Sequence, residues 1–261
     1  MKRLLILITA FTIILGVNAA KKEAQDSIRV LFIGNSFTFY NKMPEMVRTI
    51  AKNQKKNLAV TSITKGGQRL RGHLQNKELL EILKKGGWDF VIVQEQSTDP
   101  ALPTDSVKAL VYPYAHTLDS LIHAGSPKAK TIFYMTWGHK YGFRESKPHY
   151  PLMNTYDGMF HRLYTSYLEM TYDNNAICAP VGMAWDIVRK ERPNLIMYKQ
   201  DSYHPSRAGS YLIANVIYCT MFPKWYQCTY TADLQEETAD YLQQVAQNTV
   251  MNNLRLLNIE K

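Results

Sequence analysis

Cysteine is scarce in this chain of 261 residues, and its three positions limit the chemistry that thiols can contribute. Cys178, Cys219 and Cys228 show neither C-x-x-C nor zinc-finger spacing, which argues against a structural metal site. An odd count leaves at least one thiol unpaired. Cys219 and Cys228 are close enough in sequence to form a disulfide, and that pairing stays open. We expect Cys178 to pack as a small buried hydrophobic residue.

The sequence also lacks a basic stripe, although its formal net charge is +9. Lys and Arg are spread along the chain apart from short pairs such as Lys55-Lys56 and Lys84-Lys85. Nucleic-acid-binding domains cluster their basic residues on one face. We therefore expect the positive charge to lie on a solvated surface, and we expect no nucleic acid as a partner.

Only one long hydrophobic run is present, and it lies at the start of the chain. Lys2 and Arg3 precede an apolar run over 4–17, and small residues follow at 19–20. This order is typical of a secretory signal peptide, because a membrane-spanning helix needs about 20 apolar residues. We expect residues 1–20 to be a signal peptide. The protein would then be exported, either periplasmic or secreted, without stable membrane insertion after cleavage.

The rest of the chain contains no repeat, linker or low-complexity segment, and strand-like segments alternate with helix-like ones. Its composition is that of a globular domain, with 46% hydrophobic and 20% charged residues. The alternation favours a parallel sheet with helices on both faces, an α/β fold of one domain over 25–261. Strands are expected over 27–33, 58–64, 89–93, 130–136 and 176–179, and helices over 43–53, 76–85, 104–124 (split at Pro113), 152–172, 181–190, 206–221 and 232–257.

Small and polar residues follow the first three expected strands. Ser36 follows the first strand, Gly67 the second, and Gln94 and Gln96 the third. The carboxyl ends of parallel strands lie at the same edge of a sheet, where ligands bind. We therefore expect a hydroxyl, a glycine N–H and side-chain amides to meet in one cleft.

An aspartate and a histidine near the end of the chain complete this pattern. A serine nucleophile needs a base within hydrogen-bond distance, and the base needs an orienting partner. Of the seven histidines, only His204 has an aspartate three residues earlier, Asp201. One turn can bring the two side chains together, and Ser206 is a suitable N-cap for the helix that follows. The sequence predicts a triad of Ser36, His204 and Asp201.

Acyl transfer through such a triad also needs hydrogen-bond donors for the oxyanion of the tetrahedral intermediate. The Ser36 N–H lies where a strand changes to a helix, and Gly67 has no Cβ to block its N–H. The side-chain amide of Gln96 or Gln94 supplies a third donor, and the choice between the two stays open.

In this order, the segments resemble the sequence blocks of SGNH (GDSL-like) hydrolases. Gly34-Asn35-Ser36 resembles the first block, Gly66-Gly67 the second, and the Asp201-x-x-His204 pair the fifth. The resemblance implies a flavodoxin-like three-layer α/β/α fold and hydrolysis of acyl esters without a cofactor or metal. The third-strand block departs from the usual Gly-x-Asn-Asp, since Gln96 stands in place of Asn. This variant resembles a branch of exported bacterial proteins.

The remaining candidates concern the substrate. Trp137 follows the fourth expected strand and is a candidate wall for a sugar or acyl group, as is Asn35 beside the nucleophile. Tyr40 and Tyr203 are further candidates for the same surface. The leading hypothesis is an exported esterase acting on short acyl groups of glycans. The alternatives are a lipase or lysophospholipase on the same triad, and a catalytically silent glycan-binding protein. Thr38 replaces the last glycine of a G-x-S-x-G elbow, which argues against an α/β-hydrolase.

Overall fold

The computed structural model describes residues 27–146 and 149–260. The signal peptide expected over 1–20 and the domain start at residue 25 lie outside these residues and stay predictions. Five strands form one sheet in the order β2-β1-β3-β4-β5, and all neighbouring pairs are parallel. The strands are β1 (Ile28–Gly34), β2 (Leu58–Thr64), β3 (Phe90–Val93), β4 (Lys130–Tyr134) and β5 (Ile177–Ala179).

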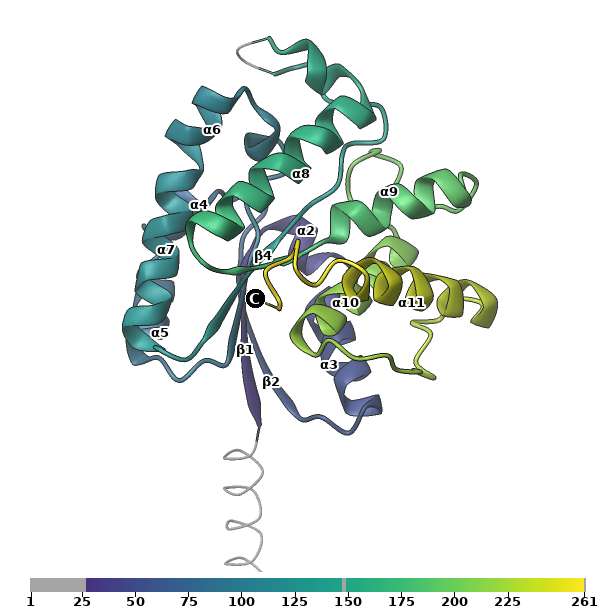
Figure 1. Ribbon diagram of the computed structural model, residues 1–261, viewed down its shortest axis with the longest axis horizontal. Coiled ribbons are helices and arrows are strands. Elements are labelled where there is room, and N and C mark those ends of the chain that lie inside the picture. Colours follow the sequence, from purple (N-terminus) through teal and green to yellow (C-terminus); the bar gives the residue numbers. More distant parts are fainter. Residues whose placement is uncertain (1–26, 147–148, 261) are drawn as a thin grey trace, which may run out of the picture.

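Helices cover both faces of the sheet, so the expected three-layer α/β/α fold is confirmed (Figure 1). One layer holds α3 (Met43–Asn53), α9 (Val181–Glu191), α10 (Arg207–Met221) and α11 (Glu236–Met251). The other holds α4 (Leu70–His73), α5 (Lys77–Lys85), α6 (Thr104–Leu110), α7 (Tyr112–Gly125) and α8 (Tyr156–Asp173). The short helix α2 (Ser36–Phe39) and the 3-10 turns η1 (Tyr40–Lys42), η2 (Asp99–Ala101) and η3 (Pro151–Asn154) lie in connecting segments.

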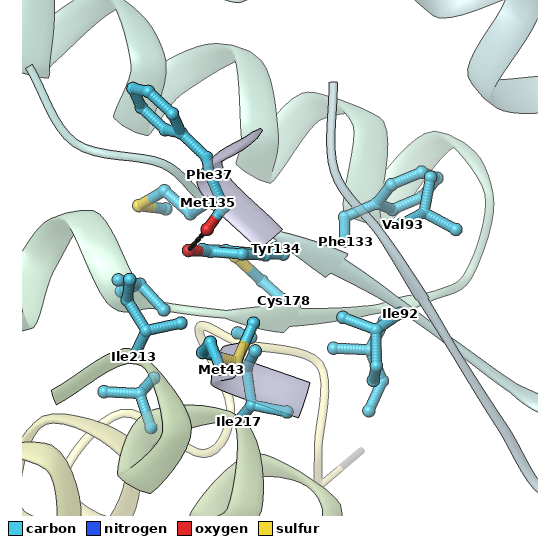
Figure 2. Packing of buried hydrophobic residues seen from close by; sticks show 14 of the residues in the cluster. Phe37, Met43, Ile92, Val93, Phe133, Tyr134, Met135, Cys178, Ile213 and Ile217 are labelled. Atoms are coloured by element: carbon cyan, nitrogen blue, oxygen red, sulfur yellow. Dashed lines mark hydrogen bonds between the residues drawn. The ribbon is translucent and has the colours of Figure 1, made fainter. Parts of the chain in front are cut away.

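The core lies between the sheet and these helix layers. The central strands are nearly continuous runs of β-branched and aromatic residues, as expected for strands buried on both faces. Figure 2 shows Ile213 and Ile217 of α10 packed close to Met43 and Cys178. In the same view, the hydroxyl of buried Tyr134 donates to the carbonyl of Phe37 at 3.2 Å. A buried core residue therefore holds α2, the helix that begins at Ser36, through a hydrogen bond to its backbone.

The split expected near Pro113 is confirmed: α6 and α7 are separate helices, because Val111 has non-helical backbone angles and Pro113 stands in the first turn of α7. The last helix covers 236–251 rather than 232–257, since Ala232 and Asp233 have positive φ angles. All three cysteines are buried free thiols, so the open pairing of Cys219 with Cys228 is not formed.

Within the described part of the chain, the helices are either too short or too polar to cross a membrane.

Candidate active site

The candidate nucleophile stands on a tight turn from β1 into α2. Asn35 caps α2 through its Oδ1, which accepts from the Phe37 N–H at 3.1 Å. Its Nδ2 donates to the Gln68 carbonyl at 3.0 Å. A Cβ at Gly34 would lie 2.4 Å from the Thr38 hydroxyl, so this position requires glycine. The turn holds Ser36 at the carboxyl end of the central strand, while the polar atoms of Asn35 serve the turn rather than a substrate.

The three residues of the expected triad lie in hydrogen-bond contact. Ser36 Oγ lies 2.8 Å from His204 Nε2, and His204 Nδ1 lies 2.8 Å from Asp201 Oδ2. The other oxygen of Asp201 accepts from the N–H groups of Tyr203 and His204, at 3.1 and 3.0 Å. Burial alone would raise the pKa of Asp201, but the hydrogen bonds from His204 and from these N–H groups lower it below its usual value. The carboxylate therefore stays ionised beside the imidazole and orients it.

The loop that carries the histidine is fastened to the segment that carries the serine. Ser206 caps α10, as expected, and its hydroxyl accepts from the Gly209 N–H at 3.1 Å. Asn41 Nδ2 donates to the carbonyls of Pro205 and Ser206, at 3.1 and 3.0 Å, and to the Ser210 hydroxyl at 2.8 Å. Because Asn41 lies two residues beyond the end of α2, these bonds hold the nucleophile and its base at a fixed distance.

Trp137 lies behind the site, which makes its expected role as a substrate wall wrong. It has no exposed surface. Its ring is stacked between Phe37 and Trp185, with centroid distances of 4.4 and 4.1 Å and interplanar angles of 5°. Its Nε1 donates to the Tyr203 carbonyl at 3.1 Å. Trp137 therefore joins the neighbour of the nucleophile to the neighbour of the base.

The structure separates the two glutamines that were candidates for the third oxyanion donor. Gln94 is fully buried, and its Oε1 accepts from the Asn35 N–H and the Thr38 hydroxyl, at 3.0 and 2.9 Å. Its Nε2 donates to the carbonyl of Glu95. Gln94 therefore shapes the nucleophile turn and lies outside the cavity lining.

Gln96 lines the cavity beside Ser36. Its Oε1 accepts from the N–H and hydroxyl of Thr98 at 2.7 and 2.8 Å, and from the Asp99 N–H at 3.1 Å. Because three donors hold the oxygen, Nε2 is the end of the side chain that is left to donate. This orientation favours Gln96 as the side-chain donor.

The two backbone donors are also placed to serve an oxyanion. Ser36 and Gly67 both line the cavity, and neither N–H donates a hydrogen bond to any residue that the structure describes. The Ser36 N–H lies in the first turn of α2, where no intrahelical acceptor exists. Gly67 has a φ angle of +66°, and a Cβ added at this position would meet no atom within 4 Å. The position therefore favours glycine because of its backbone angle and not because of close packing.

A buried carboxyl group joins the two loops that supply these donors. Glu95 is 1% exposed, and its Oε1 accepts from the N–H of Leu70 at 3.1 Å and of Gln96 at 2.5 Å. Arg69 Nε also donates to Asp99 Oδ2 across the same two loops, at 2.6 Å. The Gly67 loop and the Gln96 segment are therefore braced against each other. This brace was not predicted from the sequence, because no local spacing connects positions so far apart.

We expect Gln96→Glu to lower kcat for a p-nitrophenyl ester by about 10²–10³-fold. The carboxylate can still accept from Thr98 and Asp99, but it cannot donate to the oxyanion. Steady-state kinetics measure the effect, and the melting temperature shows whether the fold is kept. The same substitution at exposed Gln75, away from the cavity, is the matched control. A wild-type kcat for Gln96→Glu would exclude the amide as a donor.

Glu95 makes stability depend on pH. Burial raises its pKa to about 8, so the folded state binds this proton more tightly than the unfolded state. This contribution to stability is complete below about pH 4.5, the value for the exposed group, and is lost as the pH rises towards 8. Glu95→Gln keeps an acceptor oxygen but does not titrate.

We therefore expect the unfolding free energy of Glu95→Gln to decline less between pH 5 and 8 than that of the wild type. The slopes would differ by at most about 1.4 kcal/mol per pH unit. Urea unfolding at pH 5, 6.5 and 8 measures both slopes. Identical slopes would show that the group is ionised in the fold throughout this range.

The triad opens onto a cavity of 740 Å³. His139 faces it and lies 3.2 Å from the Ser97 hydroxyl through Nε2. Burial, together with the nearby His204, lowers the pKa of His139 to about 4, so its ring is neutral at pH 7. The other lining residues are aromatic, small, polar or charged: Asn35, Phe37, Phe39, Tyr40, Gly66, Gly67, Gln96, Thr98, Gly142, Phe143, Arg144, Glu145 and Tyr203.

The cavity thus gathers the expected Tyr40 and Tyr203, and it adds residues that the sequence analysis did not single out, such as His139, Ser97 and Arg144. Proximity to Trp137 in the sequence was the only signal for His139. Among the described residues, no group of three or more His, Cys, Asp and Glu is placed to hold a metal ion.

Solved structures resemble this fold over most of its length, whereas no protein-family model and no curated protein matches the sequence. A protein from Slackia heliotrinireducens assigned as an SGNH hydrolase is 29% identical, with a TM-score of 0.60 over 75% of this chain and 99% of the other. A DUF4886 family protein from Bacteroides uniformis is 18% identical, with a TM-score of 0.70 over 87% and 95%.

An acetyl xylan esterase from Geobacillus stearothermophilus is 16% identical, with a TM-score of 0.55 over 77% of this chain and 97% of the other. Identities of 16% and 18% show a similar fold alone. The Slackia protein, at 29% identity, also supports a hydrolase activity for this chain. Together with the parallel sheet and the placement of Ser36 at its edge, these comparisons show that the chain has the SGNH (GDSL-like) hydrolase fold.

Proposed function

We propose that this protein is an exported serine esterase that removes short acyl groups, such as acetyl, from glycans. The observation that carries the proposal is the continuous hydrogen-bonded series from Ser36 Oγ through His204 to Asp201, at 2.8 Å for each step. Export rests on the leader expected over 1–20. N-terminal sequencing of protein recovered from the periplasmic or culture fraction tests it, and an uncleaved Met1 would contradict it.

The geometry supports a two-step acyl transfer. Ser36 Oγ attacks the ester carbonyl while His204 Nε2 takes the hydroxyl proton, and Asp201 stabilises the imidazolium that forms. The N–H groups of Ser36 and Gly67 and the amide of Gln96 hold the oxyanion. The intermediate collapses to an acyl-enzyme as His204 gives its proton to the leaving alcohol. Water, activated by His204, then releases the carboxylic acid and restores Ser36.

The cavity lining supports a small acyl group on a sugar. Among its described lining residues there is no Leu, Ile, Val or Met, the side chains that would hold a long acyl chain. Phe39 and Tyr203 are exposed at the rim, where flat rings can pack against a sugar ring. Neutral His139 and the Ser97 hydroxyl can exchange hydrogen bonds with sugar hydroxyls. The likeness to an acetyl xylan esterase agrees with this substrate class.

Two alternatives make different predictions. A lipase or lysophospholipase would use the same triad, but the rate would rise with acyl length. The unusual Gln96 is the reason to consider a catalytically silent glycan-binding protein. It would bind sugar without turnover, and Ser36→Ala would change no ester assay.

A p-nitrophenyl ester series from acetate to palmitate separates these possibilities. We expect kcat/KM to be highest for acetate and to fall with chain length, because the lining offers no aliphatic surface to a longer chain. Detergent-free assays of the mature protein measure it, with Ser36→Ala as the background. A rise towards palmitate would favour the lipase. No turnover of any ester would favour the silent protein.

A further inference from the structure

A second cavity lies away from the triad, between α11 and the segment 225–234. Its volume is 1130 Å³, and it shares no lining residue with the cavity at Ser36. In Figure 1 this segment is the yellow-green coil that connects α10 with α11. The groove is therefore independent of the proposed esterase site.

Buried hydrogen bonds hold the groove in shape. Gln243 of α11 accepts from the Cys228 N–H at 3.1 Å and donates to the Cys228 carbonyl at 3.0 Å. Gln247, one turn further along, accepts from the Tyr226 N–H at 2.8 Å. The far side of the segment is tied to the end of α3, where Asn53 donates to the Thr229 hydroxyl at 2.8 Å. The segment is thus fastened along its length, and the groove is preformed.

The groove presents a regular row of polar side chains. Glu236, Asp240, Gln244 and Asn248 follow one another at intervals of four residues on α11, and all four are exposed and line the groove. Each step is about 6 Å along the helix axis, so the row is about 18 Å long. Their side chains make no hydrogen bond or ion pair with the residues that the structure describes. A row of free donors and acceptors with an even spacing suits a ligand that is itself a repeating polymer.

An exposed tryptophan lies at the same groove. Trp225 is 60% exposed, whereas Trp88, Trp137 and Trp185 are buried. A large flat apolar ring beside free amides and carboxylates is the combination that recognises a sugar, because a sugar ring has apolar faces and a hydroxyl edge. A protein partner would instead favour a core depleted of charged residues.

We propose that this groove binds a neutral polysaccharide chain and holds the enzyme on its polymer. Trp225 packs against one sugar ring, while Gln244 and Asn248 exchange hydrogen bonds with hydroxyl groups along the chain. Glu236 and Asp240 accept from hydroxyls and, with no cation in the lining, repel an anionic chain. The groove would raise the local concentration of enzyme on the polymer without changing its chemistry.

Affinity electrophoresis of the mature protein in native gels that contain xylan, mannan or starch tests the proposal. We expect at least one of these neutral polysaccharides to retard the wild type and Ser36→Ala equally. Trp225→Ala should weaken the binding at least about tenfold, while Trp225→Tyr, which keeps a ring, should retain most of it. Hydrolysis of p-nitrophenyl acetate should be the same for Trp225→Ala and the wild type.

The proposal is overturned if none of the three gels retards the protein, or if Trp225→Ala is retarded as strongly as the wild type. A dimer in solution that Trp225→Ala turns into a monomer would also overturn it, because a second copy would then cover the groove. Retardation of a protein that has no esterase activity would refute the proposed function, but it would still support polysaccharide binding by the groove.

Discussion

Replacing Ser36 with Ala is expected to lower kcat for p-nitrophenyl acetate by about 10⁶-fold, close to the background rate. The substitution removes the hydroxyl oxygen that lies 2.8 Å from His204 Nε2, so the base has no nucleophile to activate. Residual turnover would come from the oxyanion donors and binding alone. Single-turnover kinetics at high enzyme concentration measure the loss, and an unchanged melting temperature would show that the fold is intact.

The cavity offers a matched control for this substitution. Ser97 also faces a histidine, with its hydroxyl 3.2 Å from His139 Nε2. Burial lowers the pKa of His139 to about 4, which makes it a weak base, and no carboxylate of the described residues orients it. Ser97→Ala should therefore lose far less activity than Ser36→Ala. If the two losses were reversed, the nucleophile would be Ser97.

Asp201→Asn is expected to lower kcat by about 10⁴-fold with little effect on KM. The Asn oxygen can still accept from the N–H groups of Tyr203 and His204, so the turn should keep its shape. Its NH₂ group, however, would face His204 Nδ1 in place of the acceptor Oδ2. The imidazole would then carry its proton on Nε2 and could not take the proton of Ser36.

Steady-state kinetics with p-nitrophenyl acetate at several pH values measure this effect. The loss should persist across the pH range in which the wild type is active, because the tautomer is wrong at every pH. Asp233→Asn, on the surface and outside the triad, supplies a control for the same chemical change. A loss of only a few-fold in Asp201→Asn would mean that another group orients His204.

Local patterns in the sequence were enough to predict the strands and the contact between Asp201 and His204. Four of the five strands are short runs of mostly buried residues, whereas the edge strand β2 is partly exposed, and the parallel order brings the strand ends to one edge. Asp201 and His204 lie within one turn of each other, so their contact depends on local geometry alone. Ser206 as the cap of α10 was likewise a local prediction, and the structure bears it out.

The predictions that were wrong or left open concern residues whose roles depend on contacts between distant segments. Trp137 was expected to face a substrate, but whether a tryptophan faces a cleft or the core depends on Phe37 and Trp185, from other parts of the chain. The choice between Gln94 and Gln96 likewise depends on the three-dimensional structure, because Gln94 Nε2 is used up on a backbone carbonyl inside the protein whereas Gln96 lines the cavity. A pattern in a single sequence does not show which distant residues contact one another.

Covalent labelling with a fluorophosphonate, followed by mass spectrometry of the intact and digested protein, tests the nucleophile most directly. A serine activated by His204 and Asp201 should gain one organophosphoryl group, and the peptide that contains Ser36 should carry it. Ser36→Ala should stay unlabelled, and Asp201→Asn should label far more slowly. Ester hydrolysis without labelling of Ser36, or labelling at another residue, would contradict the proposed mechanism.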